Sequence, residues 1–216
     1  MSASWIKICG LTTPEAVEAA LAAQVDAIGF VFAPSVRRVT PQRALELAAP
    51  ARGRVKIVAV TRHPSQAEVD EVVAVFEPDL FQTDAIDLQS LRLPAQLTTL
   101  PVLRGAPTGA LPPRVLFEGA TSGSGVPCDW SAAHVVARRT ELILAGGLNG
   151  DNVAAAIAEV APFGVDVSSG VEERPGVKSP AAIARFVAAA RSAILDPTRL
   201  DRAVPESHPQ SVPTRR

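Results

Sequence analysis

The sequence has little cysteine and histidine. Two cysteines, Cys9 and Cys128, in 216 residues are too few for a disulfide scaffold, and their spacing is not that of a metal-binding pair. The three histidines, His63, His134 and His208, are scattered along the chain. We therefore expect no metal site and a reduced compartment.

Net charge is also nearly absent, at −1. Nucleic-acid binders and membrane-surface proteins usually carry a basic patch, so neither class of partner is expected. No apolar run approaches the roughly 18 residues of a membrane span. The first ten residues, MSASWIKICG, have no basic stretch followed by an apolar core, as a secretory signal would have. These absences favour a cytoplasmic location.

What the chain does have is an alternation of short apolar runs and longer amphipathic stretches. The runs are rich in Val, Ile and Leu, as is typical of strands covered on both faces. Strands that alternate with helices pair in parallel through right-handed crossovers. The eight candidate strands are 5–9, 26–32, 54–60, 79–82, 97–103, 114–118, 141–147 and 163–169.

Eight such units predict an α/β fold, a single-domain (βα)8 barrel over residues 1–195. An open doubly wound sheet is the alternative. The fifth connection, RGAPTGALPP, is too rich in Gly and Pro for a helix. Residues 196–216 hold four prolines and no aromatic residue, and we expect a disordered tail there because so little surface can be buried.

In a parallel barrel the active site lies at the carboxyl ends of the strands. Three glycine-rich loops follow the last three strands, at 120–125, 145–147 and 168–170. Glycine lets backbone N–H groups approach an anion closely, and helix N-termini add a favourable dipole. The pattern favours a phosphate site, although tight strand-to-helix turns would also use these glycines.

Two titratable residues end strands on opposite sides of the predicted barrel. Cys9 ends the first strand and is either a buried hydrophobe or a base, whose thiolate is scarce at an ordinary pKa. Glu118 ends the apolar run VLFE, where it is either solvated or an acid of raised proton affinity. Such a pair suits an isomerisation that adds one proton and removes another. Arg37 and Arg38 are either anion ligands or solvated loop charges.

Four segments in this order resemble the phosphoribosylanthranilate isomerase family: KICGLTTPEA, DAIGFVFAPSVRRVTP, LILAGGLNGDNVAAAI and VDVSSGVEERPGVKSP. The resemblance extends from about Ile6 to Ala190. It implies an enzyme of tryptophan biosynthesis, which converts phosphoribosylanthranilate to 1-(2-carboxyphenylamino)-1-deoxyribulose 5-phosphate by an Amadori rearrangement. It also implies a phosphorylated small-molecule substrate and no cofactor.

The resemblance implies roles for individual residues. Cys9 matches the general base, and Glu118 matches the general acid, which is Asp in most of the family. Arg37 matches the residue that contacts the anthranilate carboxylate, Asp166 the one that contacts the ribose, and Gln82 is a retained substrate-binding position. The expected phosphate-binding residues are Ser124, Gly125, Gly146, Gly147, Ser168, Ser169 and Gly170.

Two departures from the family pattern qualify these roles. Asp84 stands where the family commonly has His, and Cys128 stands at a Phe position. Glu118 and Asp84 leave a second hypothesis open, a degenerate barrel that binds a phosphorylated sugar without turnover. A third is a related barrel isomerase of the histidine pathway, which usually has two Asp residues and a second phosphate loop. The sequence leaves a monomer or a homodimer open.

Overall fold

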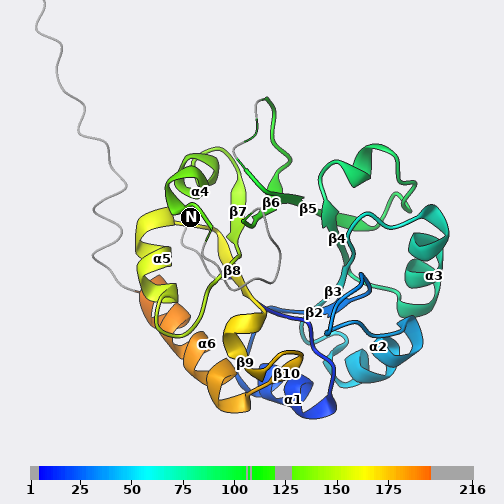
Figure 1. Ribbon diagram of the computed structural model, residues 1–216, viewed down its shortest axis with the longest axis horizontal. Coiled ribbons are helices and arrows are strands. Elements are labelled where there is room, and N and C mark those ends of the chain that lie inside the picture. Colours follow the sequence, from blue (N-terminus) through cyan, green and yellow to red (C-terminus); the bar gives the residue numbers. More distant parts are fainter. Residues whose placement is uncertain (1–4, 106, 108, 120–127, 196–216) are drawn as a thin grey trace, which may run out of the picture.

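The computed structural model describes residues 5–105, 107, 109–119 and 128–195, and its centre is a closed parallel barrel (Figure 1). Each strand pairs with the next, and the last pairs with the first, with Lys7 opposite Asp166. This closure confirms the predicted barrel and excludes the open sheet. The strands are β1 Trp5–Cys9, β2 Ala27–Val31, β3 Lys56–Val60, β4 Leu80–Asp84, β5 Thr98–Leu103, β6 Arg114–Phe117, β7 Glu141–Leu144 and β8 Gly164–Val167.

Helices surround the barrel, and most begin where the sequence supplies a cap. Thr13, Thr40, Ser65 and Asp129 each accept a hydrogen bond from a backbone N–H of the first turn, which satisfies a donor that the helix leaves unpaired. The helices are α1 Pro14–Ala22, α2 Pro41–Ala48, α3 Gln66–Phe76, α4 Trp130–Ala137, α5 Val153–Val160 and α6 Pro180–Leu195.

The connections depart from regular strand–helix alternation in three places. The β4–β5 connection contains only a 3-10 turn at Asp87–Gln89, and the described part of the β5–β6 connection contains no helix, as its Gly and Pro content predicts. After β8, a 3-10 turn at Ser169–Val171 and a hairpin precede α6. The hairpin strands are β9 Glu172–Arg174 and β10 Val177–Lys178.

One helix begins later than its sequence pattern predicts. The pattern predicts a start at Asn149, whereas α5 begins at Val153. The Asn149 side chain accepts hydrogen bonds from two backbone N–H groups, and Asn152 accepts one from Asn149. Such local side-chain bonds offer the backbone an alternative to the helix, so the first four residues form a turn.

Alternation along the strands separates two apolar layers. Outward side chains such as Ile8, Ile28 and Phe30 pack beneath the helices. Inward side chains such as Trp5 and Leu116 fill the barrel. The same inward rows carry polar residues toward the carboxyl ends of the strands, and this arrangement places the site. None of the helices in the described part of the chain is long and apolar enough to cross a membrane. The tail at 196–216 lies outside the described residues.

Candidate active site

The inward row of β1 carries Lys7 and Cys9, both of which are buried. A Cβ on Gly29 of the neighbouring strand would lie 2.9 Å from Lys7 Cε and 3.1 Å from Cys9 Sγ, so the absence of a side chain there makes room for both. Lys7 Nζ donates to Asp166 Oδ1 over 2.9 Å. Burial alone would lower the pKa of Lys7, but Asp166 and Cys9 outweigh it and raise that pKa above 10.5.

Cys9 is therefore a buried thiol beside an ion pair. Burial raises the pKa of the Cys9 thiol above its ordinary value of 9.0, and Asp166 adds to this effect, whereas Lys7 and Lys178 oppose it. A raised pKa leaves little standing thiolate in the free protein. The depressed pKa that a standing thiolate base would need is therefore not present at Cys9.

Arg37 lies close to β1, since a Cβ on Gly10 would lie 2.7 Å from Arg37 Cδ. Its guanidinium donates to both carboxylate oxygens of Glu172, over 2.7 and 2.8 Å. Lys178 Nζ donates to Glu172 Oε1 over 2.8 Å. Burial by itself would raise the pKa of Glu172, but Arg37 and Lys178 lower it to about 2. One edge of the Arg37 fork is thus held by Glu172, and the guanidinium is fixed in orientation.

This cluster predicts a strong effect on stability. Glu172→Gln leaves Arg37 and Lys178 without their shared counter-ion. The lowering of the Glu172 pKa from 4.5 to about 2 corresponds to about 3 kcal/mol. Because the folded-state pKa is depressed, this stability is present above pH 4.5 and is lost as pH falls toward about 2.

Urea unfolding at several pH values checks this prediction. The deficit of Glu172→Gln relative to the unaltered protein is expected to be full at pH 7 and to shrink below pH 4.5. Glu173→Gln, at the exposed neighbouring position, is the matched control and is expected to change little. An equal deficit at every pH would mean that the carboxylate charge is not the cause.

Glu118 follows β6 directly, and a guanidinium lies beside it. Arg104 Nη1 lies 3.4 Å from Glu118 Oε2, and Arg104 donates to Asp84 Oδ1 through Nε over 2.9 Å and through Nη2 over 2.7 Å. The sequence leaves Glu118 either solvated or an acid of raised proton affinity, and it predicts an altered charge at Asp84. The structure places Arg104, which follows β5, beside both carboxylates, where it balances the charge of Asp84.

Gln82 points into the barrel from β4 and is buried. Its Oε1 atom has no hydrogen-bond partner among the described residues. A buried acceptor without a partner costs free energy, so such an atom is suited to receive a donor from a ligand. This geometry is compatible with the substrate-binding role expected of Gln82.

The two described glycine-rich loops lie against each other. A Cβ on Gly170 would lie 1.8 Å from the carbonyl oxygen of Leu148, so only glycine fits there. Gly146 and Gly147 have φ values of 89° and 64°, which other residues rarely adopt. Among the described turn and loop residues, no backbone hydrogen bond uses the N–H groups of Gly146, Gly147, Ser168, Ser169 or Gly170.

Adjacent N–H groups of this kind suit an anion. Ser168 itself donates from Oγ to the carbonyl of Cys9, which ties this loop to β1. The two further expected phosphate ligands, Ser124 and Gly125, lie outside the described residues.

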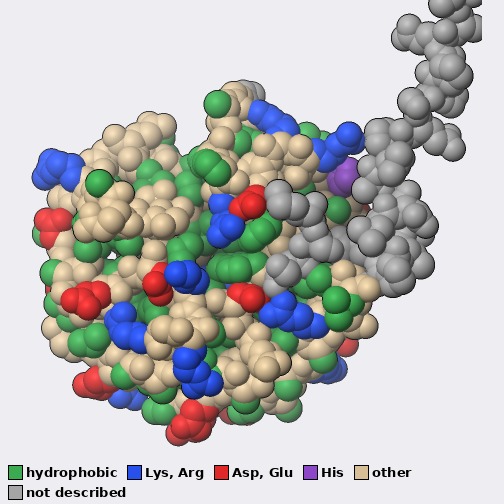
Figure 2. Space-filling model, turned by 180° about the vertical axis from the view of Figure 1, so that it is seen from behind, with side chains coloured by type: hydrophobic (Ala, Val, Ile, Leu, Met, Phe, Trp, Pro, Cys, Tyr) green, Lys and Arg blue, Asp and Glu red, His purple; other side chains and the backbone are tan. Residues whose placement is uncertain are grey.

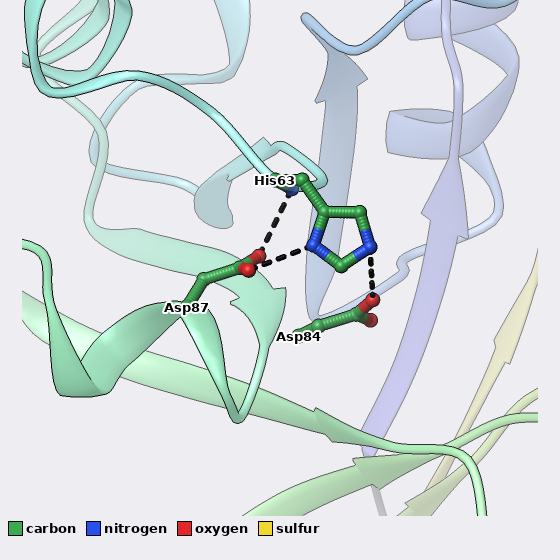
Figure 3. Close-up of side chains that lie close together, drawn as sticks. All are labelled: His63, Asp84 and Asp87. Atoms are coloured by element: carbon green, nitrogen blue, oxygen red, sulfur yellow. Dashed lines mark hydrogen bonds and ion pairs between the residues drawn. The ribbon is translucent and has the colours of Figure 1, made fainter.

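His63 is not isolated, contrary to the sequence interpretation. Its ring lies between two carboxylates, with Nδ1 2.8 Å from Asp87 Oδ1 and Nε2 3.5 Å from Asp84 Oδ2 (Figure 3). Within the described residues these three form the one group that could hold a metal ion. The two ring nitrogens face different carboxylates, and Asp84 also pairs with Arg104, so the arrangement is one of ion pairs rather than a chelate.

Figure 2 shows the barrel from the end opposite to that of Figure 1. Near the centre of this face, acidic and basic side chains gather around a depression with hydrophobic side chains at its floor.

Sequence reasoning missed four charged residues of the site: Lys7, Arg104, Glu172 and Lys178. Lys7 alternates with Cys9 and Arg104 directly follows β5, so a systematic reading of strand ends and inward rows would have found both.

The closed barrel and the titratable side chains at the carboxyl ends of its strands define a (βα)8-barrel enzyme. Residues 6–189 match the family model described as N-(5'-phosphoribosyl)anthranilate (PRA) isomerase. The chain belongs to this N-(5'-phosphoribosyl)anthranilate isomerase family.

Individual relatives agree with this assignment. The Rhizobium etli N-(5'-phosphoribosyl)anthranilate isomerase is 39% identical over 87% of this chain and 94% of its own. The crystal structure of TrpF from Jonesia denitrificans is 37% identical, covers 89% of this chain and 99% of its own, and has a TM-score of 0.73. A phosphoribosyl anthranilate isomerase in complex with reduced 1-(o-carboxyphenylamino)-1-deoxyribulose 5-phosphate is 26% identical, covers 87% of this chain and 98% of its own, and has a TM-score of 0.72.

Proposed function

We propose that this protein catalyses the Amadori rearrangement of N-(5'-phosphoribosyl)anthranilate to 1-(2-carboxyphenylamino)-1-deoxyribulose 5-phosphate, a step of tryptophan biosynthesis. One observation carries the proposal beyond family membership. Cys9 ends β1 and Glu118 follows β6, on strands separated by at least two others around the barrel. An acid and a base that face each other across the mouth are what an aldose-to-ketose isomerisation requires.

The first step is ring opening. Glu118, protonated, gives its proton to the furanose ring oxygen. The bond between that oxygen and C1 breaks with its electron pair on oxygen, and the nitrogen lone pair forms the C1=N bond of a protonated Schiff base. Glu118 is left as a carboxylate. Arg104, 3.4 Å away, stabilises the negative charge that this step creates.

The second step is proton removal from C2. Cys9, reacting from its minor thiolate form, takes this proton and becomes a thiol. The electron pair of the C–H bond forms the C1=C2 double bond of an enolamine while the C=N electrons return to nitrogen. The iminium next to C2 acidifies the proton, so transfer to a thiolate is coupled to formation of the Schiff base. Tautomerisation of the enolamine gives the ketone product, and no cofactor takes part.

In the proposal, further residues bind the substrate during these two steps. Gln82 Oε1 accepts a hydrogen bond from a sugar hydroxyl, and Asp166, held by Lys7, contacts the ribose. Arg37 keeps Nη1 for the anthranilate carboxylate while Glu172 holds its other edge. The backbone N–H groups of Gly147, Ser169 and Gly170, with those of Ser124 and Gly125, bind the phosphate, together with the loop residues Gly146 and Ser168.

The phosphate assignment predicts a large loss of affinity when the phosphate is removed. Charge-assisted hydrogen bonds contribute about 1.5 kcal/mol or more each, so losing two weakens binding by about a hundredfold. Calorimetric titration with reduced 1-(o-carboxyphenylamino)-1-deoxyribulose 5-phosphate and with its dephosphorylated form measures this difference. Equal affinity for both compounds would refute the phosphate site.

The proposal extends to the location, the oligomeric state and the partners of the protein. A cytoplasmic location, a monomer or homodimer, and the absence of nucleic-acid and membrane partners accord with a net charge of −1 and with the lack of any membrane-crossing helix among those described. The competing function is a barrel that binds a phosphorylated sugar without turnover, as Glu118 and Asp84 suggest. Product formation from N-(5'-phosphoribosyl)anthranilate separates the two functions.

A further inference from the structure

Three side chains from successive strand ends form one connected group beside the proposed acid. Asp84 ends β4, Arg104 follows β5, and Glu118 follows β6. Arg104 donates to one oxygen of Asp84 through two nitrogens, Nε and Nη2, over 2.9 and 2.7 Å. The remaining nitrogen, Nη1, is directed to Glu118 Oε2 at 3.4 Å and to the carbonyl of Gly119 at 3.3 Å. Each of the three guanidinium nitrogens therefore has at least one hydrogen-bond acceptor.

The contacts of Arg104 are unequal in strength. The two short bonds to Asp84 fix the plane of the guanidinium, and the side chains are only 22% and 9% exposed. The approach of Arg104 Nη1 to Glu118 Oε2 is longer, at 3.4 Å. Burial by itself would lower the pKa of Arg104, but the interactions with Asp84 and Glu118 outweigh burial and raise that pKa above its ordinary value, so the guanidinium stays charged.

We propose that Arg104 is a positioning residue for Glu118 and that Asp84 holds Arg104 in place for this task. The inference rests on the proposed role of Glu118 as the general acid. Arg104 aims the carboxyl toward the ring oxygen and balances the negative charge that proton donation leaves on it. Asp84 limits how strongly Arg104 stabilises the Glu118 carboxylate, because Asp84 neutralises part of the charge of the same guanidinium.

Other charged groups reach this network from the neighbouring elements. Arg62 Nε and His63 Nε2, from the β3–α3 connection, lie 3.7 and 3.5 Å from Asp84 Oδ2 on the side away from Arg104. Cys128, before α4, is influenced by the charge of Glu118, and burial raises the pKa of Cys128 to about 11, so this thiol is neutral at pH 7. The segment 120–127 carries no ionisable side chain. Arg104 is thus the described cation nearest to Glu118.

The test uses five variants of the full chain and the pH profile of kcat/KM. The reacting form has Glu118 protonated and Cys9 as a thiolate, although Cys9, whose pKa is raised, is the weaker acid of the two. With this reversed pattern of protonation, the fall of kcat/KM at high pH reports Cys9 and the fall at low pH reports Glu118. Arg104→Gln removes a cation and is expected to move the acidic limb to higher pH. Asp84→Asn strengthens the field of Arg104 and is expected to move the same limb to lower pH.

The kcat values separate the effect of the Arg104 charge from the effect of Arg104 on the orientation of Glu118. For Arg104→Gln we expect kcat to fall about ten- to hundredfold, with a much smaller change in KM, because misplacement of the acid acts on the chemical step. Arg104→Lys keeps the charge but loses the fork, so it is expected to restore the acidic limb while recovering only part of kcat. Arg62→Gln is the matched control: it removes a cation that contacts Asp84 but not Glu118, and both limbs and kcat should stay near those of the unaltered protein.

Opposite shifts of the acidic limb in Arg104→Gln and Asp84→Asn support the inference, since loss of folding alone lowers the active fraction and moves no limb. Unmoved limbs in both variants, or equal losses in Arg62→Gln and Arg104→Gln, would overturn it. Glu118→Gln is measured in the same series. If it is inactive while the limbs do not move, only the positioning role fails; if it is active, the proposed acid fails as well.

Discussion

Replacing Glu118 by Gln is expected to nearly abolish turnover while substrate still binds. Gln keeps the shape of the side chain and its approach to Arg104, but it has no proton to donate. A lost acid–base group typically costs about a hundred- to ten-thousandfold in rate. Steady-state kinetics together with calorimetric binding of the reduced product analogue measures both halves of the expectation.

Glu118→Asp is the informative companion to this variant. It keeps the acid and shortens the arm by one methylene, so measurable but reduced activity is expected. The surrounding geometry suits the longer residue, because Arg104 already lies within 3.4 Å of Glu118 Oε2. If Glu118→Gln turned over at nearly the normal rate, the acid would lie elsewhere, and Asp84, which shares Arg104 with Glu118, would be the next residue to replace.

Cys9→Ser is expected to leave the fold intact and to lower turnover by at least about a hundredfold, the low end for a lost base. The serine hydroxyl is far less acidic than a thiol and does not furnish an anion, even next to Lys7. The substitution is nearly isosteric in a position that is 6% exposed, and Lys7 and Asp166 can retain their bond.

Cys128→Ser is the matched control for Cys9→Ser. Cys128 is also buried, at 8% exposed, and has a pKa raised to about 11, but the proposed reaction does not use it. Turnover close to that of the unaltered protein is expected for this variant. Circular dichroism of both variants establishes that the fold is retained. Near-normal turnover of Cys9→Ser would remove Cys9 from the mechanism.

The barrel could be predicted from the sequence because its signals are local. Continuous apolar runs indicate strands that are covered on both faces, and Thr13, Thr40 and Ser65 mark the helix starts by capping. Even the lack of a helix in the described part of the fifth connection follows from its Gly and Pro content. The late start of α5 was not predicted, since the apolar pattern alone does not reveal that Asn149 and Asn152 form a turn with their side chains.

The site could be predicted only in part, because its ion pairs join distant residues. Cys9 and Glu118 were found from their places at strand ends. The link from Asp84 to Arg104 spans 20 residues and that from Arg37 to Glu172 spans 135, and neither leaves a local pattern. The guanidinium beside Glu118 was consequently not predicted. The likewise unpredicted raised pKa of Cys9 depends on burial, which only the closed barrel supplies.

The proposed reaction is the rearrangement of N-(5'-phosphoribosyl)anthranilate by this chain with Cys9 and Glu118. Its most direct test is the loss of anthranilate-adduct fluorescence when a catalytic amount of protein is added to freshly made substrate, with the product separated by chromatography because substrate and product have equal mass. We predict rapid loss of fluorescence and formation of 1-(2-carboxyphenylamino)-1-deoxyribulose 5-phosphate, both abolished in Glu118→Gln. Loss no faster than spontaneous decomposition, with the substrate bound but unchanged, would contradict the account.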